Sequence, residues 1–413
     1  MLRIRPHNPM PESRYEVLAL FAGAMVAASL FIVSTGTIAP FLESAFALPQ
    51  SQLGLILSVQ FVGSMFATAA AGALTDRFGD KTVLLWSGWF MGIALVCASL
   101  IHNFYWVLLW LALYGIGYAS VTPAGSHAIV FFFKKQDRGF AMGVRQCGVP
   151  LAGVLGSAIL PAVAIHFNYQ WALATAGVVT ALTCSLASVL YREPAELQGE
   201  RVSLPGMLAE MLQIARDARL ILISLTSMAL VSVQMVLLAF LTLTVVHEAG
   251  YSIAPAVGIF TLSQIAAIAG RMSWGWSSDT IFGGSRALPL AVACIATAAI
   301  VFGISWMTPH TPFWAVALLA AALGFTAEGW FGVGVIAFAE IGGEEHSGSA
   351  LGVALTWVFF AAFAAPTLFG ALVEVHGYPF AWRAVAILAL AGVVPALLAS
   401  AVAHRWAENH QAP

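Results

Sequence analysis

Twelve apolar runs, each about as long as a membrane-crossing helix, dominate this sequence. They lie near residues 17–41, 53–73, 82–101, 104–132, 139–164, 169–190, 220–246, 255–276, 287–307, 313–339, 348–373 and 382–403. A helix needs about 20 mostly apolar residues to cross a bilayer, and these runs lack the alternation of barrel strands. Only 9% of the 413 residues are charged, against about 25% in soluble domains. The sequence therefore predicts an all-α membrane protein and excludes a soluble enzyme or a nucleic-acid-binding protein.

The positively charged residues predict how these helices are oriented. Lysine and arginine accumulate on the cytoplasmic side of membrane proteins. If the N-terminus is inside, 14 of the 17 lysines and arginines lie in inner segments, the outer loops carry only Arg383, and Arg145 and Arg271 fall within spans. We therefore expect a multi-pass protein of a bacterial inner membrane, with both termini in the cytoplasm.

The chain divides into two halves of six spans each. The longest polar stretch separates the sixth span from the seventh, so we expect six-helix bundles over residues 1–190 and 220–413, joined by a cytoplasmic linker over 191–219 that includes an amphipathic helix. The segment Gly72–Lys81 after the second span is echoed by Gly275–Arg286 after the eighth. Such weak internal symmetry is typical of secondary transporters.

The segment from Gly72 to Lys81, GALTDRFGDK, resembles the loop signature of the major facilitator superfamily, G-x-x-x-D-R-x-G-x-K/R. The resemblance extends over the whole chain and implies twelve transmembrane helices in two pseudo-symmetric bundles that rock about a central site. By matching position, it implies a cytoplasmic gate that contains Asp76, Arg77 and Lys81, with Asp279 in the second half.

Two departures from patterns of this superfamily argue against a drug/proton antiporter. Many of its proton antiporters carry an arginine in the fourth span before a G-x-G pair, but here Leu111 stands at that position before Gly115 and Gly117. Its drug exporters carry G-x-x-x-G-P-x-x-G-G in the fifth span, which Gly148–Gly153 matches only in part.

Three charged residues fall inside predicted spans: Arg145 in the fifth, Arg271 in the eighth and Glu328 in the tenth. A charge within the bilayer costs at least about 2.5–3.5 kcal/mol, so each is a candidate functional residue. The fifth and eighth spans face each other in the resembling fold, which implies that both arginines lie near one cavity. Arg145 is therefore a candidate second anion contact, or else a gate contact with Asp137 or a lipid headgroup.

Arg271 lies in the segment GRMSWG, which resembles the monocarboxylate and oxalate/formate porter branch of the superfamily. In that branch the matching arginine binds the substrate carboxylate, and the planar guanidinium suits this role because it pairs bidentately. Gln264 and Trp274 lie near it on the same helix, and we expect them to contact the substrate through an amide and an apolar wall. Oxalate porters add a lysine where this chain has Phe363, so a single cation favours a monoanion. The alternatives are an arginine that reaches the headgroups or one that pairs with Asp279.

Glu328 is the deepest charge, and two roles are open to it. It can carry a coupling proton, or it can neutralise Arg271; the roles combine if protonation of Glu328 frees the arginine for an incoming anion. His127 in the fourth span is a second candidate proton carrier, although a lone histidine in a helix bundle is more often structural. Three further residues are candidates to line the substrate path: Gln60, Gln234 and Trp357.

These residues predict a secondary transporter of a small organic anion, most simply a monocarboxylate, by proton symport. A membrane potential of 100 mV opposes the entry of each negative charge by about 2.3 kcal/mol, and a co-moving proton removes that opposition. Anion exchange, multidrug/proton antiport and a membrane receptor are the alternatives. The sequence contains no catalytic constellation, nucleotide-binding loop or metal-ligand spacing. We therefore expect a monomer in the lipid bilayer with no enzyme activity, cofactor, metal or nucleic-acid partner.

Overall fold

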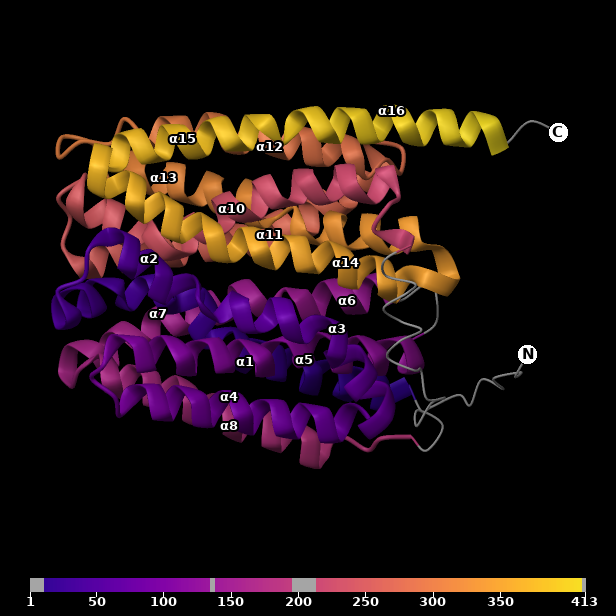
Figure 1. Cartoon of the computed structure of the whole chain (residues 1–413), viewed down its shortest axis with the longest axis horizontal. Coiled ribbons are helices and arrows are strands. Elements are labelled where there is room, and N and C mark those ends of the chain that lie inside the picture. Colours follow the sequence, from indigo (N-terminus) through magenta and orange to yellow (C-terminus); the bar gives the residue numbers. More distant parts are fainter. Residues whose placement is uncertain (1–10, 134–137, 195–212, 411–413) are drawn as a thin grey trace.

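The computed structural model describes residues 11–133, 138–194 and 213–410, and every regular element in these ranges is a helix. Twelve segments are long and apolar enough to cross a membrane, which confirms the predicted number of spans. They run side by side in one bundle (Figure 1). We call the end of the bundle where α1 begins and α16 ends the terminal end, and the other the opposite end.

The helices follow the predicted spans closely. Their bounds are α1 (Pro11–Phe46), α2 (Gln50–Ser58), α3 (Gln60–Phe78), α4 (Asp80–Ser99), α5 (Phe104–Phe132), α6 (Arg138–Gln146), α7 (Gly148–His166), α8 (Tyr169–Leu190), α10 (Ala218–His247), α11 (Ile253–Thr280), α12 (Ala287–Ile304), α13 (Phe313–Leu323), the π-helical turn η2 (Gly324–Glu328), α14 (Phe331–His376), α15 (Tyr378–Ala391) and α16 (Val393–His410). The long α14 contains two spans that meet at Gly343, whose φ of 69° breaks the helical path.

Several spans are broken where the sequence interrupts the helical hydrogen bonds. The fifth span changes from α6 to α7 at Cys147. Pro150 has no N–H to donate to the carbonyl of Gln146 four residues earlier, so that carbonyl is left for another donor. In the tenth span the π turn η2 shifts the hydrogen-bond register; π turns inside longer helices are frequent at functional sites.

The loops after the second and eighth spans need residues with positive φ. Gly79 has φ 81° between α3 and α4, and Gly283 and Gly284 have φ 59° and 83° between α11 and α12. A Cβ at Gly79 would lie 2.5 Å from both carboxylate oxygens of Glu193. That carboxylate accepts a hydrogen bond from the N–H of Asp80 at the start of α4, so it satisfies one of the free donors there.

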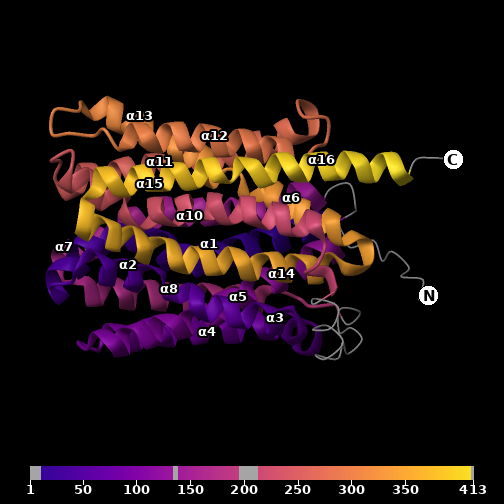
Figure 2. The same cartoon turned by 45° about the horizontal axis from the view of Figure 1, so that its top comes forward.

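The first six spans and the last six meet mainly along four helix pairs. These are α2 with α14, α3 with α14, α7 with α11, and α1 with α10, and Figure 2 shows α1, α10 and α14 running together through the middle of the bundle. Polar contacts also join the two sets of spans toward the opposite end: the Ser51 N–H to Glu374 at 2.5 Å, the Tyr378 hydroxyl to Gln50 at 3.1 Å, His247 to Glu43 at 3.6 Å, and Ser58 to Thr367 at 3.3 Å.

Part of the expected cytoplasmic gate lies outside the described residues. The side chains of Asp76 and Arg77 belong to that part, as do residues 195–212 of the linker, which include the start of the expected amphipathic helix, while Lys81 is partly exposed. Asp279 pairs with Arg286 at 2.5 Å, and Arg286 also binds Glu340 at 2.8 Å. All three residues belong to the last six spans, so this network braces α11 against α14 and does not bridge the two sets.

Candidate functional site

All three intramembrane charges are buried inside the protein. Arg145 is 1% exposed, Arg271 is 8% exposed and Glu328 is fully buried. Arg271 lies nine residues before the end of α11, about 14 Å from that end at helical rise. Glu328 lies 15 residues from each end of its span, Phe313–Gly343. The side chain of Arg271 is therefore enclosed by the protein, and Glu328 lies midway along its span.

Close glycine packing places Glu328 beside α11. A Cβ at Gly324 would lie 2.0 Å from the carbonyl oxygen of Ser263, and one at Gly270 would lie 2.3 Å from that of Phe325. Only residues without a side chain permit this approach, and it brings the π turn η2 against α11. The Gln264 side-chain amide then donates to the Glu328 carboxylate, with Nε2 at 2.6 Å from Oε1.

Arg271 reaches across to the first six spans. Its Nη1 donates to the carbonyl oxygen of Gln146 at 3.3 Å, which is the carbonyl that Pro150 leaves without a helical donor. The guanidinium also lies 5.5 Å from the ring centre of Phe331, a cation–π arrangement. Arg271 and Glu328 attract each other electrostatically, but they form no direct ion pair within the described part of the chain.

Arg145 is held by neutral groups of α5. Its guanidinium donates to the carbonyls of Val121 and Thr122 at 2.9 and 3.0 Å, and to the hydroxyl of Ser126 at 3.1 Å. Gly125 provides the room, because a Cβ there would lie 2.5 Å from Nε of Arg145. Arg145 therefore ties α6 to α5. The alternative contact with Asp137 lies outside the residues that the structure describes.

The other predicted residues lie in several different places. Gln264 and Trp274 belong to the cluster around η2, where the indole Nε1 of Trp274 donates to the carbonyl of Phe325 at 3.1 Å. Gln60 and Gln234 are buried, but neither touches this cluster through any hydrogen bond between described residues. Trp357 is half exposed. The side chain of His127 lies outside the described residues.

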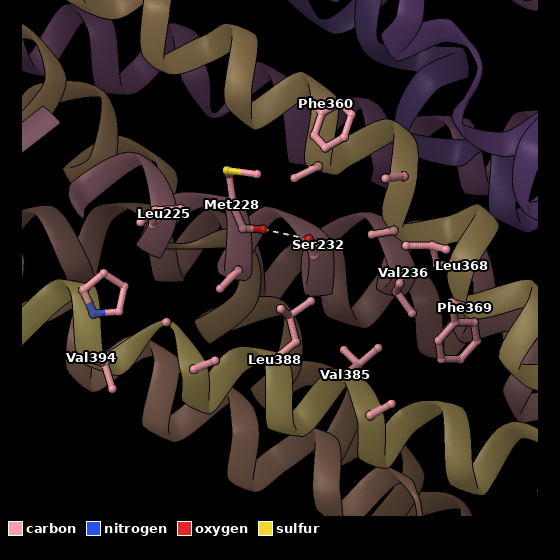
Figure 3. A pocket seen from close by; sticks show the side chains of 18 of the residues that line it. Leu225, Met228, Ser232, Val236, Phe360, Leu368, Phe369, Val385, Leu388 and Val394 are labelled. Carbon is pink, nitrogen blue, oxygen red and sulfur yellow. Dashed lines mark hydrogen bonds between the residues drawn. The ribbon is translucent and has the colours of Figure 1, made fainter. Parts of the chain in front are cut away.

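An apolar cavity of about 690 Å³ lies away from this cluster, between α10, α14, α15 and α16. Figure 3 shows its lining of leucine, valine, phenylalanine and methionine side chains. Its hydroxyl group, on Ser232, already donates to the carbonyl of Met228 at 2.7 Å. Trp357 precedes Phe360 and Ala361 of this lining by one helical turn, so it shares their face of α14. The cavity offers nothing to bind a charged group.

Sequence reasoning missed three parts of the charged cluster. The Gln146 carbonyl and the ring of Phe331 both contact Arg271, and Tyr118 of α5 lies within electrostatic range of Arg145 and Arg271. Pro150 was a usable signal for the free carbonyl, whereas nothing in the local sequence marks Tyr118 or Phe331. Among the described residues, no group of three metal-ligating side chains comes together.

Comparison with known proteins identifies the family of this chain. The family model described as Major Facilitator Superfamily matches residues 19–312. An uncharacterized MFS-type transporter of Mycobacterium tuberculosis is 28% identical over 385 residues, covering 92% of this chain and 84% of the relative. The 3-(3-hydroxy-phenyl)propionate transporter of Escherichia coli is 26% identical over 252 residues, covering 61% and 62%.

A solved structure shares the same fold. The crystal structure of a bacterial homolog of the human lysosomal transporter Spinster superposes with a TM-score of 0.75 at 15% identity, covering 94% of this chain and 97% of that one. At this identity the likeness concerns the fold alone. With twelve spans, the expected loop signature and a family model that matches most of its length, the chain belongs to the Major Facilitator Superfamily.

Proposed function

We propose that this chain is a proton-coupled symporter of a small organic monoanion, most simply a monocarboxylate. The observation that carries the proposal is the setting of Arg271. It is a buried cation at the contact between the two sets of six spans, it has no directly paired carboxylate among the described residues, and it lies within electrostatic range of Glu328. A substrate carboxylate can supply the missing partner.

The charges of the cluster give a reason for coupling to protons. When Glu328 is ionised, its negative charge offsets that of Arg271, and an incoming anion gains little. When Glu328 takes up a proton, the arginine is left uncompensated in a medium where charges interact strongly. An anion then binds favourably, and the loaded site carries a proton and an anion together. This pairing also removes the opposition of the membrane potential to inward anion movement.

Alternating access completes the proposal. The bundles over residues 1–190 and 220–413 rock about Arg271 and Glu328, and the linker over 191–219 joins them. The excess of basic residues supports a cytoplasmic position for the terminal end in a bacterial inner membrane. The polar contacts between α2 and α14 then close the outer end in this conformation. The E. coli relative is named for a substrate that carries a carboxylate, which supports this class of cargo.

Transport by purified protein in proteoliposomes tests the proposal. A thermal-shift panel of small carboxylates, including 3-phenylpropionate and lactate, identifies an anion to use as the labelled substrate. Wild-type protein should accumulate this anion when the outside is acidic. Glu328→Gln should abolish pH-driven accumulation but retain exchange of labelled for unlabelled anion, and Arg271→Gln should abolish both. Glu340→Gln, which changes an exposed carboxylate at the terminal end, serves as the matched control.

Two outcomes would contradict the proposal. If Glu328→Gln still accumulates the anion in response to a pH gradient, Glu328 is not the proton carrier, and anion exchange becomes the better description. If Arg271→Gln binds the carboxylate as tightly as the wild type, the arginine is a structural brace and the proposed substrate class is wrong.

A further inference from the structure

The side chain of Gln264 links the buried acid to the other set of spans. Its Nε2 donates to Oε1 of Glu328 at 2.6 Å, and both residues are fully buried. Oε1 of Gln264 and Oε2 of Glu328 have no hydrogen-bond partner within the part of the chain that the structure describes. One hydrogen bond therefore joins the pair, and two further acceptors are not used. Nε2 of Gln264 also donates to the neighbouring hydroxyl of Ser263 at 3.4 Å.

The same amide rests on Gly153 of α7. A Cβ at Gly153 would lie 2.5 Å from Oε1 of Gln264 and 2.8 Å from its Cδ, so the amide fills the place of the missing side chain. One turn farther along the same pair of helices, the hydroxyls of Ser157 and Thr261 lie 2.7 Å apart. Gln264 thus contacts Glu328 with one end of its amide and the first six spans with the other.

The two charge states of Glu328 favour opposite orientations of this amide. An ionised carboxylate only accepts hydrogen bonds, so it holds the NH₂ group of Gln264 and turns the amide oxygen toward Gly153, as observed. A protonated carboxyl has an O–H to donate, and the unused acceptor beside it is the oxygen of Gln264. Reversal of the amide satisfies that O–H, but it places the NH₂ group against the Cα of Gly153, which offers no acceptor.

We infer that Gln264 is the positioning residue that transmits the protonation of Glu328 to the contact between α7 and α11. Proton uptake reverses the amide, leaves a buried donor against Gly153, and weakens this contact between the two sets of spans. The inference rests on the proposed function, because it takes Glu328 as the proton carrier. It changes the role of Gln264 from a substrate contact to a coupling element.

The packing around η2 makes this transmission efficient. Gly270 and Gly324 bring η2 and α11 into backbone contact, so a local rearrangement there is not absorbed by loose side chains. The helices packed against η2 are α10, α11, α12 and α13. On α11, Arg271 is the charged group at the level of Glu328. The helix α12 adds only the thiol of Cys294, and α13 has no titratable residue. The charged residues of α10 lie near its ends. Asp279 near the end of α11 is the other carboxylate on these helices, but it is largely exposed and pairs with Arg286, so Glu328 is the buried carboxylate at this contact.

Gln264→Met tests the inference, since methionine is similar in length but forms no comparable hydrogen bond. In proteoliposomes we expect the variant to keep anion exchange within about threefold of the wild type and to lose at least about tenfold in accumulation driven by a pH gradient, the size expected for one hydrogen bond to an ionisable group. A merely structural role would lower both activities together.

Infrared difference spectra between low and high pH supply a second readout. The carbonyl stretch of protonated Glu328, identified by its loss in Glu328→Gln, should move to higher frequency in Gln264→Met because the O–H loses its acceptor. Gly153→Ala should produce the same shift by pushing the amide away from the opposite side. Gly258→Ala is the control, since a Cβ there meets nothing within 4 Å.

The outcomes separate the two proposals. If the wild type shows no accumulation driven by a pH gradient, the proposed function fails and this inference fails with it. If the wild type is coupled but Gln264→Met keeps the same coupling and the same carbonyl frequency, the proposed function stands and the role of Gln264 is refuted. Should Gln264→Met fail to fold, the comparison of Gly153→Ala with Gly258→Ala decides by the same two measurements.

Discussion

Gly125→Ala should destabilise the protein because the new methyl group displaces the buried guanidinium of Arg145. The Cβ of the new alanine would lie 2.5 Å from Nε, 2.7 Å from Cζ and 2.9 Å from Nη2 of Arg145. The guanidinium is buried in this slot and is held by three hydrogen bonds to α5. It has to move away from α5 to admit a methyl group.

The size of the effect follows from the contacts that are lost. A hydrogen bond to a charged group contributes about 1.5–3 kcal/mol. Movement of Nη2 breaks its bonds to the carbonyls of Val121 and Thr122, a loss of about 3–6 kcal/mol by that measure. Alanine is about 1 kcal/mol better than glycine inside a helix. We therefore expect Gly125→Ala to lower the free energy of unfolding by about 2–5 kcal/mol.

Reversible unfolding in mixed micelles, followed by circular dichroism, measures this difference. Gly275→Ala is the matched control, because it also lies inside a transmembrane helix but a Cβ there meets nothing within 4 Å. It should be neutral or slightly stabilising. If Gly125→Ala proves as stable as Gly275→Ala, the slot for Arg145 is not the reason for glycine at position 125, and the assignment of Arg145 as a brace is wrong.

Three further predictions concern other parts of the structure. The double variant Ser58→Cys, Thr367→Cys should form a disulfide between α2 and α14, because the two hydroxyls lie 3.3 Å apart. Anion uptake by this variant should stop until a reductant is added. Uptake by either single variant should be unaffected by oxidant. Burial raises the pKa of Asp217, but hydrogen bonds from Arg219 outweigh this effect and leave the pKa below its usual value. The stability that this carboxylate contributes should therefore be present above about pH 4 and should be lost as the pH falls through the lower folded pKa. Unfolding titrations of Asp217→Asn should show less sensitivity to acid. Glu340→Gln should cost less than about 1 kcal/mol of unfolding free energy in low salt and nothing measurable in high salt, because its pair with Arg286 is exposed and screened.

Hydropathy located the spans because the bilayer imposes its own length scale. The predicted run 104–132 coincides with α5, and 169–190 coincides with α8. The breaks inside spans were harder to see. Pro150 signals the change at Cys147, but the π turn at Gly324–Glu328 has no comparable mark. It lies where Gly270 and Gly324 allow close contact with α11.

The charged residues show where prediction from sequence ended. Arg145, Arg271 and Glu328 stood out because a charge in an apolar span is costly. Their partners did not, because they lie far away in the chain: Glu328 bonds a residue 64 positions earlier, and Arg271 bonds one 125 positions earlier. Asp279 was a candidate partner for Arg271, but the structure pairs it with Arg286.

The sequence by itself determined that this chain crosses a membrane twelve times, belongs to a transporter superfamily and carries three charges within its spans. Only the tertiary structure decided that Arg145 is bound to α5, that Arg271 meets the carbonyl freed by Pro150, and that Gln264 lies between Glu328 and Gly153. The physical reason is that lipid and protein interior are equally apolar, so the pattern of apolar residues does not reveal which face of a span turns inward. Contacts between helices supply that information.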